Sequence, residues 1–137
     1  MERIKSKKYP EQLIFSLLRV NEIQNVRTDL SPDEEYIQVS GRKMSAGFAV
    51  PPHRHTRLER NTDFTQEAWV ILQGKVLATF YDLDDSFLCE RVINPGDVVV
   101  FYRGGHALTV LEDDTIFYEF KSGPYFGLEN DKVKIDA

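Results

Sequence analysis

The 137-residue sequence is poor in several features, and each shortage excludes a class of protein. Cys89 is the only cysteine, which excludes a disulfide framework and favours a reducing cytosol. The apolar run at residues 14–20 is too short and too broken to cross a bilayer. The basic start, M-E-R-I-K-S-K-K, is not followed by the apolar stretch of a secretory signal. We therefore expect a cytoplasmic protein that does not bind membranes.

Net charge and length exclude further classes of protein. A formal net charge of -5 and a pI near 5.2 argue against binding to nucleic acid. The composition, 42% hydrophobic and 28% charged, is that of an ordinary globular domain, and the length fits one domain. We expect a single domain over residues 1–137, made of an N-terminal arm and strand (1–33), a barrel (34–121) and a C-terminal tail (122–137).

Short apolar segments separated by turn signals predict an all-β sandwich or barrel. We expect residues 1–10 to be frayed, 12–20 to form a strand or a short helix, and 21–33 to form a loop. Gln73-Gly74 lies between two apolar runs and predicts a β-hairpin over residues 67–83. The expected strands are residues 36–40, 45–50, 67–72, 75–83, 87–93, 98–102, 106–111 and 115–120.

The sequence has three histidines, and together with one glutamate they suggest a metal site. His53 and His55 point the same way on an extended chain, because side chains alternate between faces. Glu67 and His106 each begin an apolar strand that follows a turn or loop. Three imidazoles and a carboxylate suit one divalent transition metal (Fe, Mn, Zn or Ni). Alternatively, His53 and His55 are exposed loop residues and His106 is a core residue bonded to the backbone.

Two stretches resemble the signatures of the cupin superfamily. Residues 47–74 contain G-x5-H-x-H and then E-x6-G, and residues 96–106 contain G-D-x4-Y-x-G-x-H. The resemblance implies a cupin-type double-stranded β-helix, a jelly-roll barrel of two antiparallel sheets with a metal inside. It also implies that the metal ligands are His53, His55, Glu67 and His106.

The sequence departs from these signatures at three points. Eleven residues separate His55 from Glu67, where the family has three or four, and Glu59 has the family spacing. Glu59 is therefore the rival metal ligand. Tyr102 stands where the family has proline, one residue is missing before His106, and Val110 stands where asparagine is expected.

Other side chains are candidates for catalysis or substrate binding. If Glu119 faces inward with Phe117, it is a buried acid with a raised pKa and a candidate general base. If Tyr118 and Phe120 face the core instead, Glu119 points to solvent. Tyr102 is a second catalytic candidate. The candidate substrate-binding residues are Arg57, Arg60, Trp69 and Tyr81, with Arg57 and Arg60 on a loop that is either a lid or solvated surface. Arg103 is either a residue of the barrel mouth or plain surface.

The function we expect is that of a metal-dependent enzyme acting on a small polar metabolite. Residues 118–125 resemble small bacterial cupins linked to polysaccharide and sugar-nucleotide synthesis, which implies a sugar or sugar nucleotide as the ligand. Isomerase or epimerase chemistry is the first expectation and dioxygenase the second. The alternatives are a non-catalytic binding or sensor protein, and a metal-free sugar ketoisomerase. Because residues 67–83 are apolar on both faces, the second face needs cover from the N-terminal segment or a second subunit, so we expect a homodimer.

Overall fold

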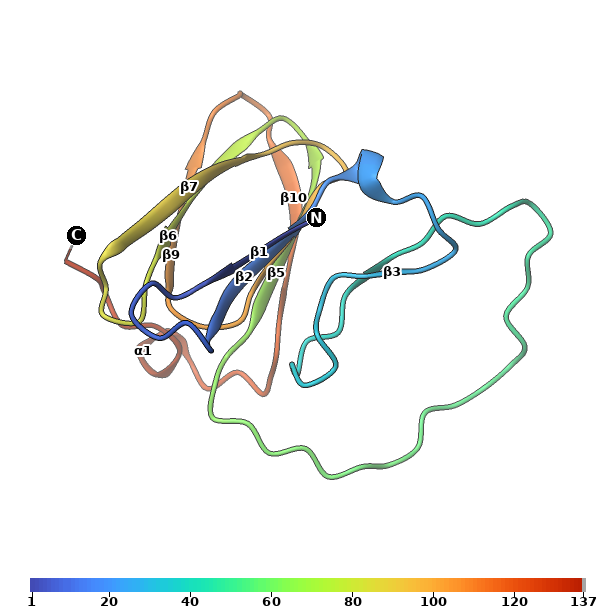
Figure 1. Cartoon of the computed structure of the whole chain (residues 1–137), viewed down its shortest axis with the longest axis horizontal. Helices are drawn as coiled ribbons and strands as arrows, with labels where there is room; N and C mark the ends of the chain where they lie inside the picture. Colours follow the sequence, from blue (N-terminus) through green and yellow to red (C-terminus); the bar gives the residue numbers. More distant parts are fainter. Residues whose placement is uncertain (137) are drawn as a thin grey trace.

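The computed structural model describes residues 1–136, and antiparallel β-strands dominate it (Figure 1). A five-stranded sheet has the order β1-β2-β8-β5-β10, and a three-stranded sheet has the order β7-β6-β9. β3 and β4 form a small separate pair. The strands are β1 (Glu2–Lys5), β2 (Leu13–Leu18), β3 (Thr28–Asp29), β4 (Ser40–Gly41), β5 (Glu67–Gln73), β6 (Val76–Tyr81), β7 (Phe87–Ile93), β8 (Val98–Phe101), β9 (Gly105–Val110) and β10 (Ile116–Lys121).

The main core lies between the two larger sheets. Phe15 of β2 stacks on Phe80 of β6, with ring centroids 3.6 Å apart, and Phe80 stacks on Phe101 of β8 at 5.4 Å. All three side chains are buried. Burying large aromatic side chains from both sheets is the main favourable contribution that holds the sheets together. The expectation of an all-β protein with antiparallel sheets is confirmed.

A second core covers the outer face of the five-stranded sheet. Ile23, Leu30, Ile37 and Val39 of the N-terminal half pack against residues that include Ala68, Val98 and Val100. The central strands β2 and β8 are therefore buried on both faces, which explains why every residue of these two strands is buried and all but Ser16 are apolar. The outer face of β5 is covered within the chain at Ala68, whereas Leu72 is exposed together with Tyr118 and Phe120 of the neighbouring β10. The homodimer stays a prediction.

The predicted hairpin over residues 67–83 is wrong. β5 pairs with β8 and β10, whereas β6 pairs with β7 and β9, so the two strands belong to different sheets. The turn at Gly74 carries the chain from one sheet to the other. Gly74 has φ +72°, and a Cβ there would lie 2.9 Å from the Cα of Thr115. Glycine is required because the turn passes close to the start of β10.

Two predicted strands before β5 are also wrong. Of residues 36–40 only Ser40 lies in a strand, and it pairs with Asp29 inside the segment that we predicted to be a loop. Residues 45–50 form no strand and belong to an exposed segment, residues 42–65, that projects from the sheets (Figure 1). A strand needs a partner for its backbone groups, and the pattern of residues 45–50 does not say where that partner is.

The two ends of the described chain are ordered by contacts with the sheets. Residues 2–5, predicted to be frayed, form β1 and pair with β2. The C-terminal segment contains one helical turn, α1 (Leu128–Asp131). Among residues 1–136 no helix combines the length and apolar character that a membrane crossing requires.

Candidate functional site

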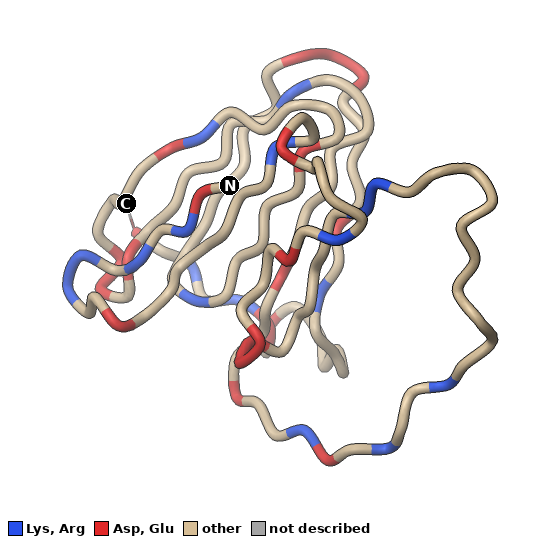
Figure 2. Tube along the Cα trace, turned by 45° about the vertical axis from the view of Figure 1, so that its right-hand side comes forward, with Lys and Arg blue, Asp and Glu red and all other residues tan. Residues whose placement is uncertain are grey.

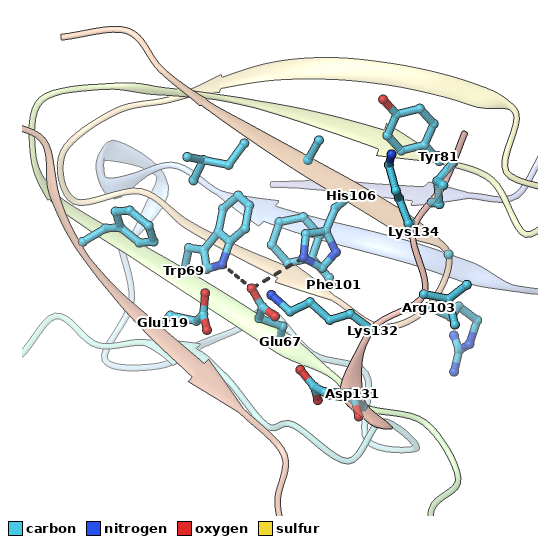
Figure 3. Close-up of a pocket in the computed structure, with 18 residues that line it drawn as sticks. Glu67, Trp69, Tyr81, Phe101, Arg103, His106, Glu119, Asp131, Lys132 and Lys134 are labelled. Atoms are coloured by element: carbon cyan, nitrogen blue, oxygen red, sulfur yellow. Dashed lines mark hydrogen bonds and ion pairs between the residues drawn. The ribbon is translucent and has the colours of Figure 1, made fainter. Parts of the chain in front are cut away.

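A cavity of about 600 Å³ opens at one end of the two sheets (Figure 3). Strands from both sheets line it, as does the segment that follows α1. The polar or charged side chains among the lining residues are Thr65, Glu67, Tyr81, Arg103, His106, Glu119, Asp131, Lys132 and Lys134. The aromatic side chains of Trp69, Phe101 and Phe117 form much of the remaining wall.

Glu67 and His106 meet inside this cavity. Alternation along β5 puts Glu67 and Trp69 on the same face, and the Trp69 Nε1–H donates a hydrogen bond of 2.5 Å to Glu67 Oε1. His106 Nε2 lies 3.5 Å from the same carboxylate oxygen (Figure 3). Lys121 Nζ is 3.6 Å from the other oxygen. The carboxylate therefore connects β5, β9 and β10.

Aromatic rings fix the orientation of His106. The imidazole stacks on Phe101 with centroids 4.2 Å apart, and its edge meets Trp69 at 5.4 Å. Gly104, with φ +74°, makes the turn between β8 and β9, and a Cβ there would lie 2.6 Å from the Tyr81 carbonyl oxygen. The tight turn brings Phe101 and His106 onto the same wall of the cavity.

The Glu67 carboxyl is strongly acidic although it is buried. Burial alone would raise its pKa, but contacts with His106, the Trp69 indole and Lys121 outweigh that effect and lower the pKa to about 2. Lys121 is held in the charged form, because the adjacent Asp131 and Glu67 raise its pKa. At neutral pH Glu67 is a carboxylate, able to accept hydrogen bonds or to bind a cation.

The structure brings together two of the four predicted metal ligands. His53 and His55 lie on the exposed segment, residues 42–65, with ring centroids 5.5 Å apart, and His53 Nδ1 is 3.0 Å from the Pro51 carbonyl oxygen. Glu59, the rival ligand, is exposed on the same segment. Within residues 1–136 no group of three or more His, Cys, Asp or Glu side chains is arranged to hold a metal. The pair Glu67 and His106 suits a metal as a partial donor set, and the complete site stays a prediction.

The two catalytic candidates have different outcomes. Glu119 lines the cavity together with Phe117, while Tyr118 and Phe120 are exposed on the opposite face. Of the two alternatives left open by the sequence, the inward-facing one holds, but the Glu119 side chain is 44% exposed. Glu119 is therefore not a buried acid and lies at the cavity mouth. Tyr102 is fully buried in the second core, because it follows Phe101 on β8 and faces the other way. Tyr102 therefore does not line the cavity, which contradicts its choice as a catalytic candidate.

The substrate-binding candidates also divide into two groups. Trp69 and Tyr81 line the cavity as expected. Arg57 and Arg60 are exposed on residues 42–65 and do not line it. Arg103 is a mouth residue, and its guanidinium makes two contacts of 2.9 and 3.0 Å with the carboxylate of Glu35.

Sequence reasoning missed several residues of the site, among them Lys121, Phe101, Asp131 and the two lysines of the C-terminal segment, Lys132 and Lys134. Lys121 continues the inward face of Phe117 and Glu119, so extending the alternation by one step would have found it. Phe101 lies one residue before Tyr102, on the inward face of β8. Asp131, 3.0 Å from Lys121, comes from the C-terminal segment, and no pattern in the sequence places that segment at the cavity.

No protein-family model matches the chain, and no curated protein or solved structure matches it either.

Proposed function

We propose that the chain is a cupin-type enzyme for a small polar metabolite, with Glu67 and His106 as the fixed half of a metal site. The observation that supports this is the 3.5 Å contact between the two side chains inside a cavity of ligand size. Trp69, Phe101 and Lys121 hold the pair in place through the contacts described above. Glu67 and His106 are already close enough to bind one ion without a rearrangement of the strands that carry them.

His53 and His55 complete the site when residues 42–65 fold over the cavity mouth. β9 is an edge strand, and in the described chain no strand pairs with its free edge. Residues 45–50 have the alternating pattern of a strand, and pairing them with β9 brings the following histidines towards His106. A segment of 24 residues has a contour length of roughly 80 Å, ample for this movement.

Charge favours the same closure. Residues 42–65 contain five basic and two acidic residues, a net charge of +3 (Figure 2). The chain as a whole has a net charge of -5, so the remainder carries -8. A basic segment is attracted to an acidic body.

The chemistry that fits this cavity is isomerisation or epimerisation of a sugar-like ligand. A divalent ion, when bound, polarises a carbonyl or hydroxyl oxygen of the ligand. Glu119, at the mouth, accepts a proton from the carbon adjacent to the ligand's carbonyl carbon. In an isomerisation it returns this proton to the former carbonyl carbon, and the proton of the neighbouring hydroxyl moves to the former carbonyl oxygen. In an epimerisation the proton returns to the opposite face of the carbon that lost it. Trp69 and Tyr81 form the wall against which a sugar ring packs.

A second candidate function follows from the same contact. Glu67 next to His106 is also the arrangement of a carboxylate that orients a general-base imidazole, which needs no metal. This is the metal-free sugar ketoisomerase, with His106 moving the proton and Glu67 stabilising the imidazolium.

Metal analysis of the purified protein separates the two candidates. After incubation with Fe(II), Mn(II), Zn(II) or Ni(II) and removal of free ion, we expect about one ion per chain. His106→Ala, Glu67→Gln and the double variant His53→Ala/His55→Ala each lose the metal, whereas Glu59→Gln keeps it. Glu119→Gln is the matched control, since it makes the same chemical change in the same cavity without removing a ligand. Wild-type protein that retains no ion under any of these conditions favours the metal-free candidate.

A further inference from the structure

The C-terminal segment forms one wall of the cavity. Residues 131–135 all line it, and together they carry two lysines and one aspartate. The side chain of Ile135 lies so close to Gly105 that a Cβ at that position would overlap it. Asp131, whose side chain is only 10% exposed, contacts Lys121 at 3.0 Å, and Lys121 in turn contacts Glu67. The segment is thus attached to the Glu67–His106 centre through an ion-pair chain.

Two cations on this segment have no acidic partner within the part of the chain that the structure describes. Lys121 is paired with Asp131, Glu67 and Glu119, and Arg103 is paired with Glu35. No carboxylate of residues 1–136 lies within 4.0 Å of the ammonium groups of Lys132 or Lys134. In Figure 3 Lys132 extends towards the Glu67–His106 pair, and Lys134 extends along the Tyr81 end.

The charges of the cavity are separated along its length. Glu119 lies on the β10 side, while Arg103 and Lys134 lie at the opposite end (Figure 3). Aromatic side chains stand between these ends. Apolar walls exclude water and strengthen the field of the cations at one end of the cavity. An anionic group is attracted to the side on which the C-terminal segment lies, where Lys132 stands between Lys134 and the Glu67–His106 pair, and it is repelled by Glu119.

We infer that the ligand of this cavity carries a phosphoryl or carboxylate group, which Lys132 and Lys134 of the C-terminal segment bind. This inference rests on the proposed function in placing the reacting part of the ligand at Glu67 and His106. It adds that the ligand is an anion, oriented with its charged group at the C-terminal segment and its hydroxyl-bearing part at the centre. Lysine suits this role, because it offers a point charge on a flexible stem to an anion of either geometry.

Trp69 provides the measurement, because it is the only tryptophan of the chain and it lines the cavity. We expect its fluorescence to change saturably on titration with inorganic pyrophosphate, a phosphoryl probe, or with malonate, a carboxylate probe. Sodium chloride of equal ionic strength serves as the comparison and should give no saturable change. The probe that binds at the lower concentration shows whether the anionic group of the ligand is a phosphoryl or a carboxylate group.

The variant Lys132→Ala/Lys134→Ala should raise the apparent Kd of the better probe about tenfold or more, because two charge-assisted contacts are lost. Lys75→Ala is the matched control, since it removes one exposed lysine that pairs with Glu112 and does not line the cavity. It should leave the Kd unchanged. Unaltered affinity in the double variant, or no saturable change with either anion in the wild type, would overturn the inference.

The titration is run on protein stripped of metal and again on protein incubated with Zn(II). The lysine effect is expected in both samples. If the protein takes up none of the four ions but still binds the anion, the metal-dependent function is contradicted and this inference stands. If the protein binds metal but neither anion, the metal-dependent function stands and this inference is overturned.

Discussion

Glu67 illustrates how a charged residue can be buried without loss of its charge. Its carboxylate accepts the Trp69 N–H and lies near the cations of Lys121 and, when protonated, His106. Leaving a buried carboxylate unpaired costs several kcal/mol, so the partners stabilise the fold as well as the site. Removing the Glu67 side chain would therefore destabilise the fold as well as the site. Glu67→Gln is the variant chosen for the metal analysis because it preserves the shape and the hydrogen-bonding capacity of the side chain.

Asp82 gives a prediction at the same scale. Its buried side chain accepts the backbone N–H groups of Lys7 and Leu83, each at 2.7 Å. Burial raises its pKa, but these bonds and a contact with Ser6 outweigh it, so the folded-state pKa lies below 3.8. A carboxyl with a lowered pKa stabilises the fold above pH 3.8, and the effect is lost as the pH falls through the folded value.

We therefore expect Asp82→Asn to lower the free energy of unfolding by about 1–3 kcal/mol at neutral pH. The difference from wild type should shrink as the pH falls below about 3.8. Urea unfolding followed by circular dichroism at several pH values measures it. A difference that stays constant from pH 7 to pH 3 would show that the Asp82 charge contributes nothing.

At the scale of elements, sequence reasoning succeeded where the pattern of apolar residues within a strand is sufficient to locate it. The inward face of Glu67 and Trp69 followed from alternation, and the structure has strands close to the expected ranges from β7 to β10. Sequence reasoning failed where the formation or pairing of a strand depends on a partner that is distant in the sequence. Gln73-Gly74 has the composition of a hairpin turn, yet β5 and β6 join different sheets, and residues 45–50 have a strand pattern but no neighbouring strand. Pairing is a tertiary property, and local pattern does not determine it.

The Gly74 turn gives a prediction at this scale. Gly74→Ala forces a side chain into the left-handed region and against the backbone of Thr115, so we expect destabilisation of about 2–5 kcal/mol. Gly47→Ala is the matched control, because Gly47 also has positive φ but has open space around it, and about 1–2 kcal/mol is expected there. Thermal and urea unfolding measure both. Equal losses in the two variants would show that the close approach of Thr115 is unimportant.

At the scale of the whole molecule, a rigid part and an exposed part meet at Gln66. This buried residue donates from its backbone N–H to Ser122 Oγ, and its side chain bonds to Glu35 and to the backbone of Ile37. These bonds anchor the end of the exposed segment directly before Glu67. Residues 42–65 can therefore change position without displacing the Glu67–His106 pair.

Limited proteolysis with trypsin tests the central claim most directly, because residues 42–65 contain exposed sites after Arg54, Arg57 and Arg60. The account predicts that a bound divalent transition metal slows cleavage at these sites in the wild type and has no effect in His106→Ala. Circular dichroism confirms that the variant is folded, and a peptide substrate confirms that the ion leaves trypsin active. Equal cleavage of the wild type with and without metal, or equal protection in His106→Ala, would contradict a site shared between this segment and the Glu67–His106 pair.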